Sequence, residues 1–156
     1  MTKTTLCYIE KDGSYLMLHR TKKKNDANEG KWIGIGGKFL PGETSEECLI
    51  REAKEETGLD LISYKLKGIV TFLSDIYDDE EMYLYVCDEF SGELSECDEG
   101  ELKWIKKEAV PLLNLWEGDR IFLKLLSDNH PYFTLCLKYK KDTLTEAILD
   151  NQIKIV

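Results

Sequence analysis

Three glutamates near the middle of the chain have a spacing that could hold a metal ion. Glu52, Glu55 and Glu56 occupy positions i, i+3 and i+4, which places their side chains on one side of a helix. Like charges at these spacings repel one another and weaken an isolated helix. Converging carboxylates suit Mg²⁺ or Mn²⁺, which commonly connect a few carboxylates to substrate phosphates. The alternative interpretation is an acidic helix face that is simply solvated.

The helix that carries these glutamates is predicted at residues 44–57. Thr44 precedes Glu47 by three residues, which is the spacing of a capping box. Gly58 stands where a left-handed C-terminal cap is expected. The side predicted to pack against the rest of the protein holds Leu49, Ile50, Ala53 and Thr57.

The surroundings of the helix favour the metal site over the solvated face. A glycine-rich turn with Lys38 and Glu43 comes before the helix. Arg51 lies one residue before Glu52 and four before Glu55, so its guanidinium can hold a carboxylate in place.

Residues 37–59, GKFLPGETSEECLIREAKEETGL, resemble the Nudix box GX5EX7REUXEEXGU, in which U is apolar. The matching fixed positions are Gly37, Glu43, Arg51, Glu52, Glu55, Glu56 and Gly58. At average residue usage, seven such matches arise by chance on the order of 10⁻⁸ times per starting position. The resemblance implies an α+β protein with the Nudix fold, an α/β/α sandwich with a mixed sheet, whose box helix and loop form a divalent-metal site.

The resemblance also implies roles for individual residues. Nudix chemistry is the attack of water on a phosphorus of a nucleoside diphosphate linked to another group. The implied metal ligands are Gly36 through its carbonyl, Glu52, Glu55 and Glu56. Arg51 and Glu43 would orient these groups. The general base stays open, because the family draws it either from the box helix or from a loop outside it.

Segments outside the box resemble the MutT-type 8-oxo-dGTP diphosphatases of this family. Residues 32–38 match their Trp-x-Gly-x-Gly-Gly-Lys lead-in. Residues 97–104 resemble their acidic loop, in which Glu99 would join the metal site. Arg20 and Lys38 are candidates for holding phosphate.

The base-binding part of the resemblance is weaker. Residues 115–119 resemble the Trp-x-x-Asp segment that binds the purine, which assigns Trp116 and Asp119 to the base, although Trp116 could equally be a packing residue. Ile33 stands where some oxidised-purine hydrolases have an Asn that reads the base, and Gly118 stands where a second acid can occur. Loss of a buried polar side chain that hydrogen-bonds to the base reduces the discrimination between bases by on the order of 1–3 kcal/mol per hydrogen bond.

The function that the resemblance implies is an Mg²⁺-dependent pyrophosphohydrolase, with Mn²⁺ as a substitute metal. It would convert a nucleoside triphosphate, an oxidised purine such as 8-oxo-dGTP first of all, to the monophosphate and pyrophosphate, and so cleanse the nucleotide pool and avoid mutation. Alternative substrates within the family are unmodified nucleoside triphosphates, dinucleoside polyphosphates and nucleotide sugars. A Nudix-fold binding module without turnover is disfavoured, because every acid of the box is present.

Strands are predicted on both sides of the box helix. Two apolar runs, 4–10 and 14–19, indicate a hairpin. Further strands are predicted at 64–73, 82–90, 102–105 and 131–139, and a second helix at 119–126. This is a mixed α+β pattern, and the chain is expected to form one domain, residues 1–156.

The composition limits the possible partners and compartment. The chain has 156 residues and a formal net charge of −9, which disfavours nucleic acid as a partner but not a small nucleotide held by a metal. Five scattered cysteines indicate neither a disulfide framework nor a zinc site. With neither a secretory signal nor a membrane segment in the sequence, the expected compartment is the cytoplasm. Whether the protein is a monomer or a homodimer stays open.

Overall fold

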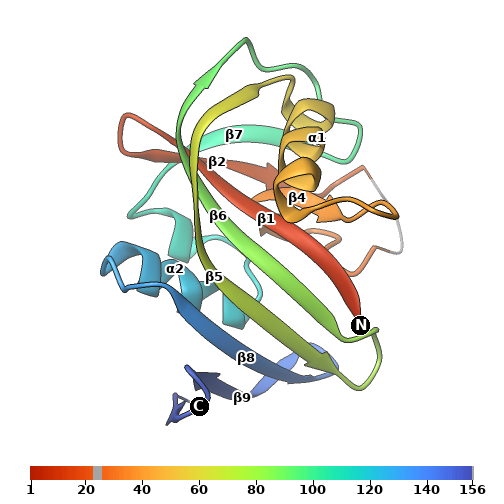
Figure 1. The fold of residues 1–156 in the computed structure, drawn as a ribbon, viewed down its shortest axis with the longest axis vertical. Coiled ribbons are helices and arrows are strands. Elements are labelled where there is room, and N and C mark those ends of the chain that lie inside the picture. Colours follow the sequence, from red (N-terminus) through yellow and green to blue (C-terminus); the bar gives the residue numbers. More distant parts are fainter. Residues whose placement is uncertain (23–25, 156) are drawn as a thin grey trace.

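The protein, seen here as a computed structural model, is described for residues 1–22 and 26–155. Its elements follow the chain in the order β1 (Thr2–Lys11), β2 (Ser14–His19), β3 (Trp32–Ile33), β4 (Ile35–Lys38), α1 (Ser45–Thr57), β5 (Asp60–Ser74), β6 (Glu80–Ser91), β7 (Glu101–Lys106), the short 3₁₀ helix η1 (Val110–Leu112), α2 (Glu117–Ser127), β8 (Phe133–Lys140), β9 (Thr143–Leu149) and β10 (Ile153–Lys154). Figure 1 shows their arrangement.

Strand β1 joins the two parts of the sheet. It pairs in parallel with β6 and antiparallel with β4, so that Leu6 lies between Leu84 and Gly36. Beyond β6 the order is β5, β8, β9 and β10. At its far end β1 forms a hairpin with β2, which is flanked by β3 and β7. The sheet is therefore mixed, as predicted.

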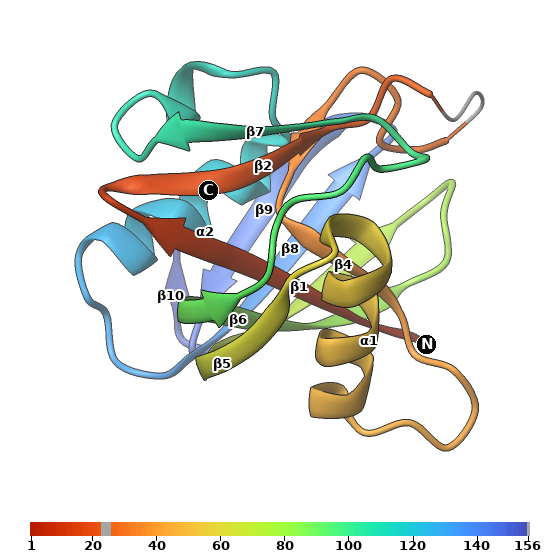
Figure 2. The same ribbon diagram turned by 90° about the horizontal axis from the view of Figure 1, so that it is seen from above.

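Alternate residues of β1 face two hydrophobic cores. Leu6 and Tyr8 belong to the core that includes Phe122 of α2, whereas Cys7 and Ile9 belong to the core beneath α1. Because side chains alternate across a strand, the two helices must cover opposite faces. Figure 2 shows the sheet between α1 and α2. This arrangement confirms the predicted α/β/α sandwich.

Helix α1 begins and ends where its capping residues require. Thr44 Oγ1 accepts from the Glu47 backbone N–H at 3.2 Å, and Glu47 Oε1 accepts from the Thr44 N–H at 3.0 Å. Gly58 closes the helix in the left-handed region, with φ of 79°. The helix predicted at residues 44–57 is therefore confirmed.

One residue of the predicted packing face is misplaced. Leu49 and Ala53 are buried, but Ile50 is 42% exposed. Ile50 follows Leu49, so its side chain points about 100° further around the helix. The buried stripe of α1 is too narrow to include that direction.

The other predicted elements are present, with different ends. The strands expected at 64–73 and 82–90 are the central parts of β5 and β6, and the second helix starts two residues earlier than predicted. Strand β9 was not predicted, although it forms a hairpin with β8. The glycine-rich segment before α1, described above as a turn, includes the four-residue strand β4.

The described residues can be compared with the expectations about membrane segments and cysteines. No helix within residues 1–22 and 26–155 is long and apolar enough to cross a membrane. All five cysteines are free, as expected, and four of them are buried.

The capping box makes a prediction about the stability of the helix that carries the glutamates. Thr44→Ala removes the oxygen that accepts from Glu47 N–H, and it should lower the free energy of unfolding by about 1 kcal/mol. Thermal denaturation should show this as a fall in Tm of roughly 2–4 °C. Thr44→Ser keeps the acceptor and serves as the control. Equal losses in both variants would contradict the capping role.

Candidate functional site

The candidate site lies where β4 leads through the loop before α1 into that helix. The backbone N–H of Gly36 donates to Glu56 Oε1 at 2.9 Å, which joins the strand to the last turn of the helix. A Cβ at Gly37 would lie 2.6–2.8 Å from the carboxylate atoms of Glu52, a distance that real Cβ contacts do not show. Glycine at position 37 therefore allows the Glu52 carboxylate to lie directly on the strand.

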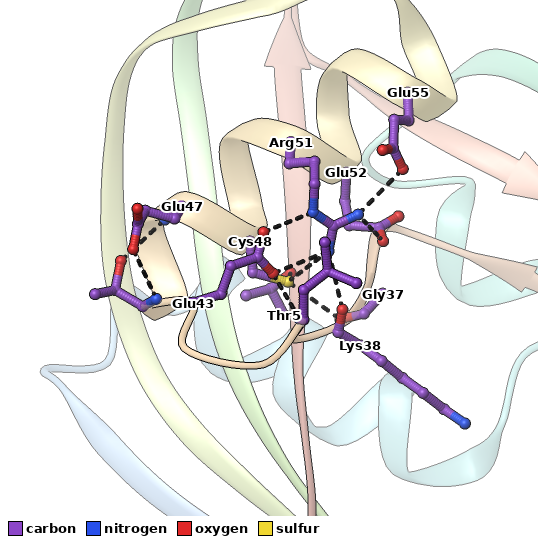
Figure 3. A network of polar contacts seen from close by, with 11 residues as sticks. Thr5, Gly37, Lys38, Glu43, Glu47, Cys48, Arg51, Glu52 and Glu55 are labelled. Atoms are coloured by element: carbon purple, nitrogen blue, oxygen red, sulfur yellow. Dashed lines mark hydrogen bonds and ion pairs between the residues drawn. The ribbon is translucent and has the colours of Figure 1, made fainter.

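Arg51 is the centre of the polar network in Figure 3. Its guanidinium donates to both oxygens of Glu43, from Nε at 2.6 Å and from Nη2 at 3.0 Å. Nη1 donates to Glu52 at 2.9 Å and to Glu55 at 3.1 Å, and Nη2 also donates to the carbonyl of Lys38 at 3.0 Å. One side chain thus connects the loop, the strand and two of the three helix glutamates.

Glu43 is held in its charged form. Two hydrogen bonds from Arg51, together with one from the Leu40 N–H at 2.7 Å, lower the pKa of Glu43 to about 2. The same pairing, mainly with Glu43 and then with Glu52, raises the pKa of Arg51. Glu43 and Arg51 therefore stay ionised together and act as a fixed support for the loop.

Glu56 is the least satisfied acid of the site. Its side chain is buried, 6% exposed, and its Oε2 atom has no hydrogen-bond partner within the described residues. Burial, followed by repulsion from Glu52 and Glu99, raises the pKa of Glu56 to about 9. The charge of Arg20 acts in the opposite direction but is weaker, and Arg20 is already paired with Asp26 and Glu99.

Glu99 reaches the site from a loop more than forty residues further along the chain. Its backbone carbonyl accepts from the Lys22 N–H at 3.1 Å, and its carboxylate pairs with Arg20 Nη1 at 3.1 Å. Burial is the main cause that raises the pKa of Glu52 and of Glu56, and the negative charge of Glu99 adds to both shifts. The predicted acidic loop is therefore electrostatically coupled to the box helix.

Arg20, predicted to hold phosphate, is buried and paired with acids. Its side chain is 9% exposed and contacts Asp26 at 2.7 Å as well as Glu99. Lys38, the other phosphate candidate, is exposed, and its side chain extends away from the Arg51 network (Figure 3). Of the two candidates, Arg20 lies beside the acidic loop, and Lys38 is open to solvent.

The oxygen atoms of the site are suitable ligands for a hard divalent cation, although the carboxylates do not converge on a single position. Within residues 1–22 and 26–155, no group of acidic, histidine or cysteine side chains converges closely enough to hold an ion. Arg51 accounts for part of this, because its Nη1 draws Glu52 and Glu55 to itself. Mg²⁺ and Mn²⁺ prefer oxygen ligands, and the carboxylates of this site offer only oxygen. One of these atoms, Oε2 of Glu56, has no hydrogen-bond partner within the described residues.

A second cluster lies at the start of α2, on the other face of the sheet. Trp116 Nε1 donates to Asn28 Oδ1 at 2.9 Å, and its ring meets Tyr139 edge-on at 5.4 Å. Asp119, in the first turn of α2, is 5% exposed. Lys31 Nζ lies 4.9 Å from the centre of the Trp116 ring. An aromatic surface, a buried acid and a cation are therefore neighbours.

The structure separates Ile33 from this cluster. Ile33 packs against the core beneath α1, whereas Trp116 packs against the core that contains α2. Gly118 has no space for a side chain, because an added Cβ would lie 2.5 Å from Leu137 Cδ1 and 2.7 Å from the Tyr139 hydroxyl. Neither position supplies a polar contact to the ring of Trp116.

Sequence reasoning missed three residues of these two clusters. Asp26 closes the ion-pair chain of Arg20 and Glu99, Lys31 covers Trp116, and Tyr139 accepts from the Gly118 N–H at 2.7 Å. Lys31 had a usable signal, because it directly precedes the tryptophan of the glycine-rich lead-in. Asp26 and Tyr139 come from distant segments with no motif of their own.

Comparison with known proteins agrees with this geometry. The family model described as NUDIX domain matches residues 2–126. The chain is 32% identical to the uncharacterized Nudix hydrolase YvcI of Bacillus subtilis, over 76% of this chain and 75% of that protein. It is 28% identical to an oxidized purine nucleoside triphosphate hydrolase of Danio rerio, over 94% of this chain and 93% of that one.

The fold comparison leads to the same family. The crystal structure of a mutator MutT protein from Bacillus halodurans superposes with a TM-score of 0.87 at 26% identity, covering 98% of this chain and all of that one. Together with the family match over most of the sequence, this shows that the chain belongs to the Nudix hydrolases, with MutT proteins among its relatives, and acts on phosphoric anhydrides of nucleotides.

Proposed function

We propose that this protein is a divalent-metal-dependent pyrophosphohydrolase of purine nucleoside triphosphates, with oxidised purines such as 8-oxo-dGTP as its preferred substrates. The products are the nucleoside monophosphate and pyrophosphate. The observation that carries the proposal is Glu56, a buried carboxyl with one oxygen on the Gly36 N–H and the other without a partner, beside two further acids. Arg20 is the cation whose charge acts on Glu56, but it is already paired with Asp26 and Glu99, so a divalent cation would supply the balancing charge.

The residues that would hold the metal are Glu52, Glu55 and Glu56 of α1, Glu99 of the loop before β7, and the carbonyl of Gly36. Mg²⁺ at this place would neutralise phosphate charge and acidify a bound water. Arg51 and Glu43 fix the loop and the helix relative to one another, so that the backbone that carries the carboxylates is held in position. Lys38, exposed at the end of β4, is placed to attract the anionic triphosphate.

The base would lie against the cluster at the start of α2. Trp116 is only partly buried, so its ring can take part in stacking, and Asp119 lies one turn further on. Burial, followed by repulsion from Glu80, raises the pKa of Asp119 to about 7, against the lowering effects of Arg120 and Lys31. Near neutral pH the carboxyl of Asp119 can either donate or accept a hydrogen bond. This suits a purine base, whose edge carries both donors and acceptors.

A second candidate function is hydrolysis of unmodified nucleoside triphosphates without base selection. The observations that favour it are Ile33, which packs away from Trp116, and Gly118, which has no space for a second acid. An enzyme that reads only phosphates would use the same metal site.

The two candidate functions predict different substrate profiles. Mg²⁺-dependent pyrophosphate release should be measured in parallel from 8-oxo-dGTP, dGTP, dATP, a dinucleoside polyphosphate and a nucleotide sugar. Our proposal expects kcat/KM for 8-oxo-dGTP to exceed that for dGTP by about tenfold or more, as one or two extra hydrogen bonds supply. Equal values for all triphosphates would favour the second candidate, and activity on another compound alone would reject both.

Glu56 provides the sharpest test of the metal site. Glu56→Gln keeps the shape and the acceptor for Gly36 N–H but removes the charge, and it should lower kcat at least about 100-fold. The stabilisation of the protein by added Mg²⁺, measured as a shift in Tm, should be lost as well. Glu46→Gln, an exposed glutamate on the same helix, is the matched control. Near-wild-type turnover in the Glu56 variant would overturn the assignment.

Asp119 makes the stability of the protein depend on pH. Its pKa is about 7 in the folded protein, above the ordinary value of 3.8, so its contribution to stability is present below pH 4 and is lost as the pH rises through 7. Asp119→Asn stays neutral and avoids this loss. The Tm of the variant should exceed that of wild type above pH 7, by an amount corresponding to a few kcal/mol at most, and the difference should vanish near pH 4.

The control for this comparison is Asp128→Asn, an exposed aspartate just after the same helix. A Tm difference between Asp119→Asn and wild type that does not vary between pH 4 and 8 would contradict the buried acid.

A further inference from the structure

Lys31 has a defined position over the ring of Trp116. Its Nζ atom lies 4.9 Å from the ring centre and donates to Asn114 Oδ1 at 3.4 Å. Burial, followed by repulsion from Glu80, raises the pKa of Asp119, and the charge of Lys31 acts in the opposite direction. Lys31 therefore contacts the ring that the proposed function assigns to the base, and its charge acts on the acid assigned to the base.

The backbone on both sides of Lys31 is fixed to the segment that carries Trp116. Asn114 Nδ2 donates to the carbonyl of Gly30 at 3.0 Å, and the Trp32 N–H donates to the carbonyl of Asn114, also at 3.0 Å. Trp116 itself donates to Asn28. Because these contacts hold residues before and after Lys31, its side chain starts from a position that is set relative to the indole ring.

The ammonium of Lys31 retains hydrogen-bonding capacity. An ammonium group has three donors, and the bond to Asn114, at 3.4 Å, is long for a hydrogen bond. Arg120, the other cation whose charge acts on Asp119, donates instead to the carbonyls of Pro111, Leu113 and Leu115 and to Glu117. Of these two cations, Lys31 is the one able to serve a ligand.

We propose that Lys31 is a specificity-determining residue of this enzyme, which selects guanine-type purines by donating from its ammonium to a carbonyl oxygen of a base stacked at Trp116. The inference rests on the proposed function and names a residue that the proposed function does not include. It also supplies a polar contact in a cluster where Ile33 and Gly118 provide none.

The chemistry of the bases explains the direction of selection. Guanine presents O6 as an acceptor, and its 8-oxo form adds the O8 acceptor, whereas adenine carries an amino donor at the position of O6. An ammonium has donors only, so it pairs with the carbonyl and is repelled by the amino group. Selection therefore favours guanine-type over adenine-type nucleotides, without any change in the handling of the triphosphate.

The test compares two variants of Lys31 with a matched control. Lys31→Met keeps the length of the side chain and removes the charge, and Lys31→Arg keeps the charge and the donors. Lys11→Met is the control, because Lys11 also lies over a tryptophan ring, with its Nζ 5.9 Å from the centre of Trp104. This substitution changes the net charge by the same amount as Lys31→Met. Kinetic constants for 8-oxo-dGTP, dGTP and dATP are measured with Mg²⁺.

The expected result for Lys31→Met is a fall of about tenfold in the ratio of kcat/KM for guanine-type over adenine-type substrates, mainly through KM. Lys31→Arg should restore most of the ratio, and Lys11→Met should leave it unchanged. Equal loss on all three substrates would overturn the inference and make Lys31 a general attractor of anions. An unchanged ratio would reduce Lys31 to a packing partner of Trp116.

A binding measurement separates this inference from the proposed function. Titration of wild type and Lys31→Met with 8-oxo-dGMP and dAMP, followed by tryptophan fluorescence, requires neither metal nor turnover. A preference of wild type for 8-oxo-dGMP that disappears in Lys31→Met supports the inference even where no triphosphate is hydrolysed. Absence of hydrolysis in the wild type would reject the proposed function alone, and equal binding of both nucleotides by wild type would reject the role of Lys31.

Discussion

Repulsion among carboxylates that cannot move apart is the constraint on which the candidate site depends. Helix geometry places Glu52 and Glu56 on neighbouring turns, and burial prevents water from screening Glu56. Arg51 relieves this repulsion at Glu52 and Glu55 but makes no contact with Glu56. The Arg51 guanidinium is therefore a fixed support, and the charge of Arg20 is too weak to offset the raised pKa of Glu56, an arrangement that costs stability in the free protein and suits the binding of a cation.

The rest of the fold holds helix α1 close to the sheet. Leu49 and Ala53 fasten α1 to the sheet, and the Gly36 N–H holds Glu56 from the strand below. Strand β1 carries β4 on one edge and faces both cores, so the acidic cluster at α1 and the aromatic cluster at the start of α2 share one support. The two clusters lie on different faces of the sheet and are connected through β3, whose neighbours are Lys31 on one side and β4 on the other.

Local signals made the box helix predictable, because its cap, its acids and its terminal glycine lie within one short segment. Ile50 was misassigned because helical periodicity gives the direction of a side chain and not the width of the surface that covers it. The pairing of Arg20 with Asp26 and Glu99 could not be predicted, since it depends on how two loops meet in space. The opposite packing of Ile33 and Trp116 depends likewise on strand register, which the sequence leaves open where glycines are frequent.

The contact between Gly118 and Tyr139 has a consequence for the substitutions that position 118 can accept. Tyr139 of β8 accepts from the Gly118 N–H and occupies the volume that a side chain at position 118 would need. A carboxyl at position 118 would require both Leu137 and Tyr139 to shift or to become smaller, and a smaller residue at position 139 would leave the N–H at the start of α2 without its acceptor. Positions 118, 137 and 139 are therefore coupled, and a single substitution at position 118 is expected to lower stability.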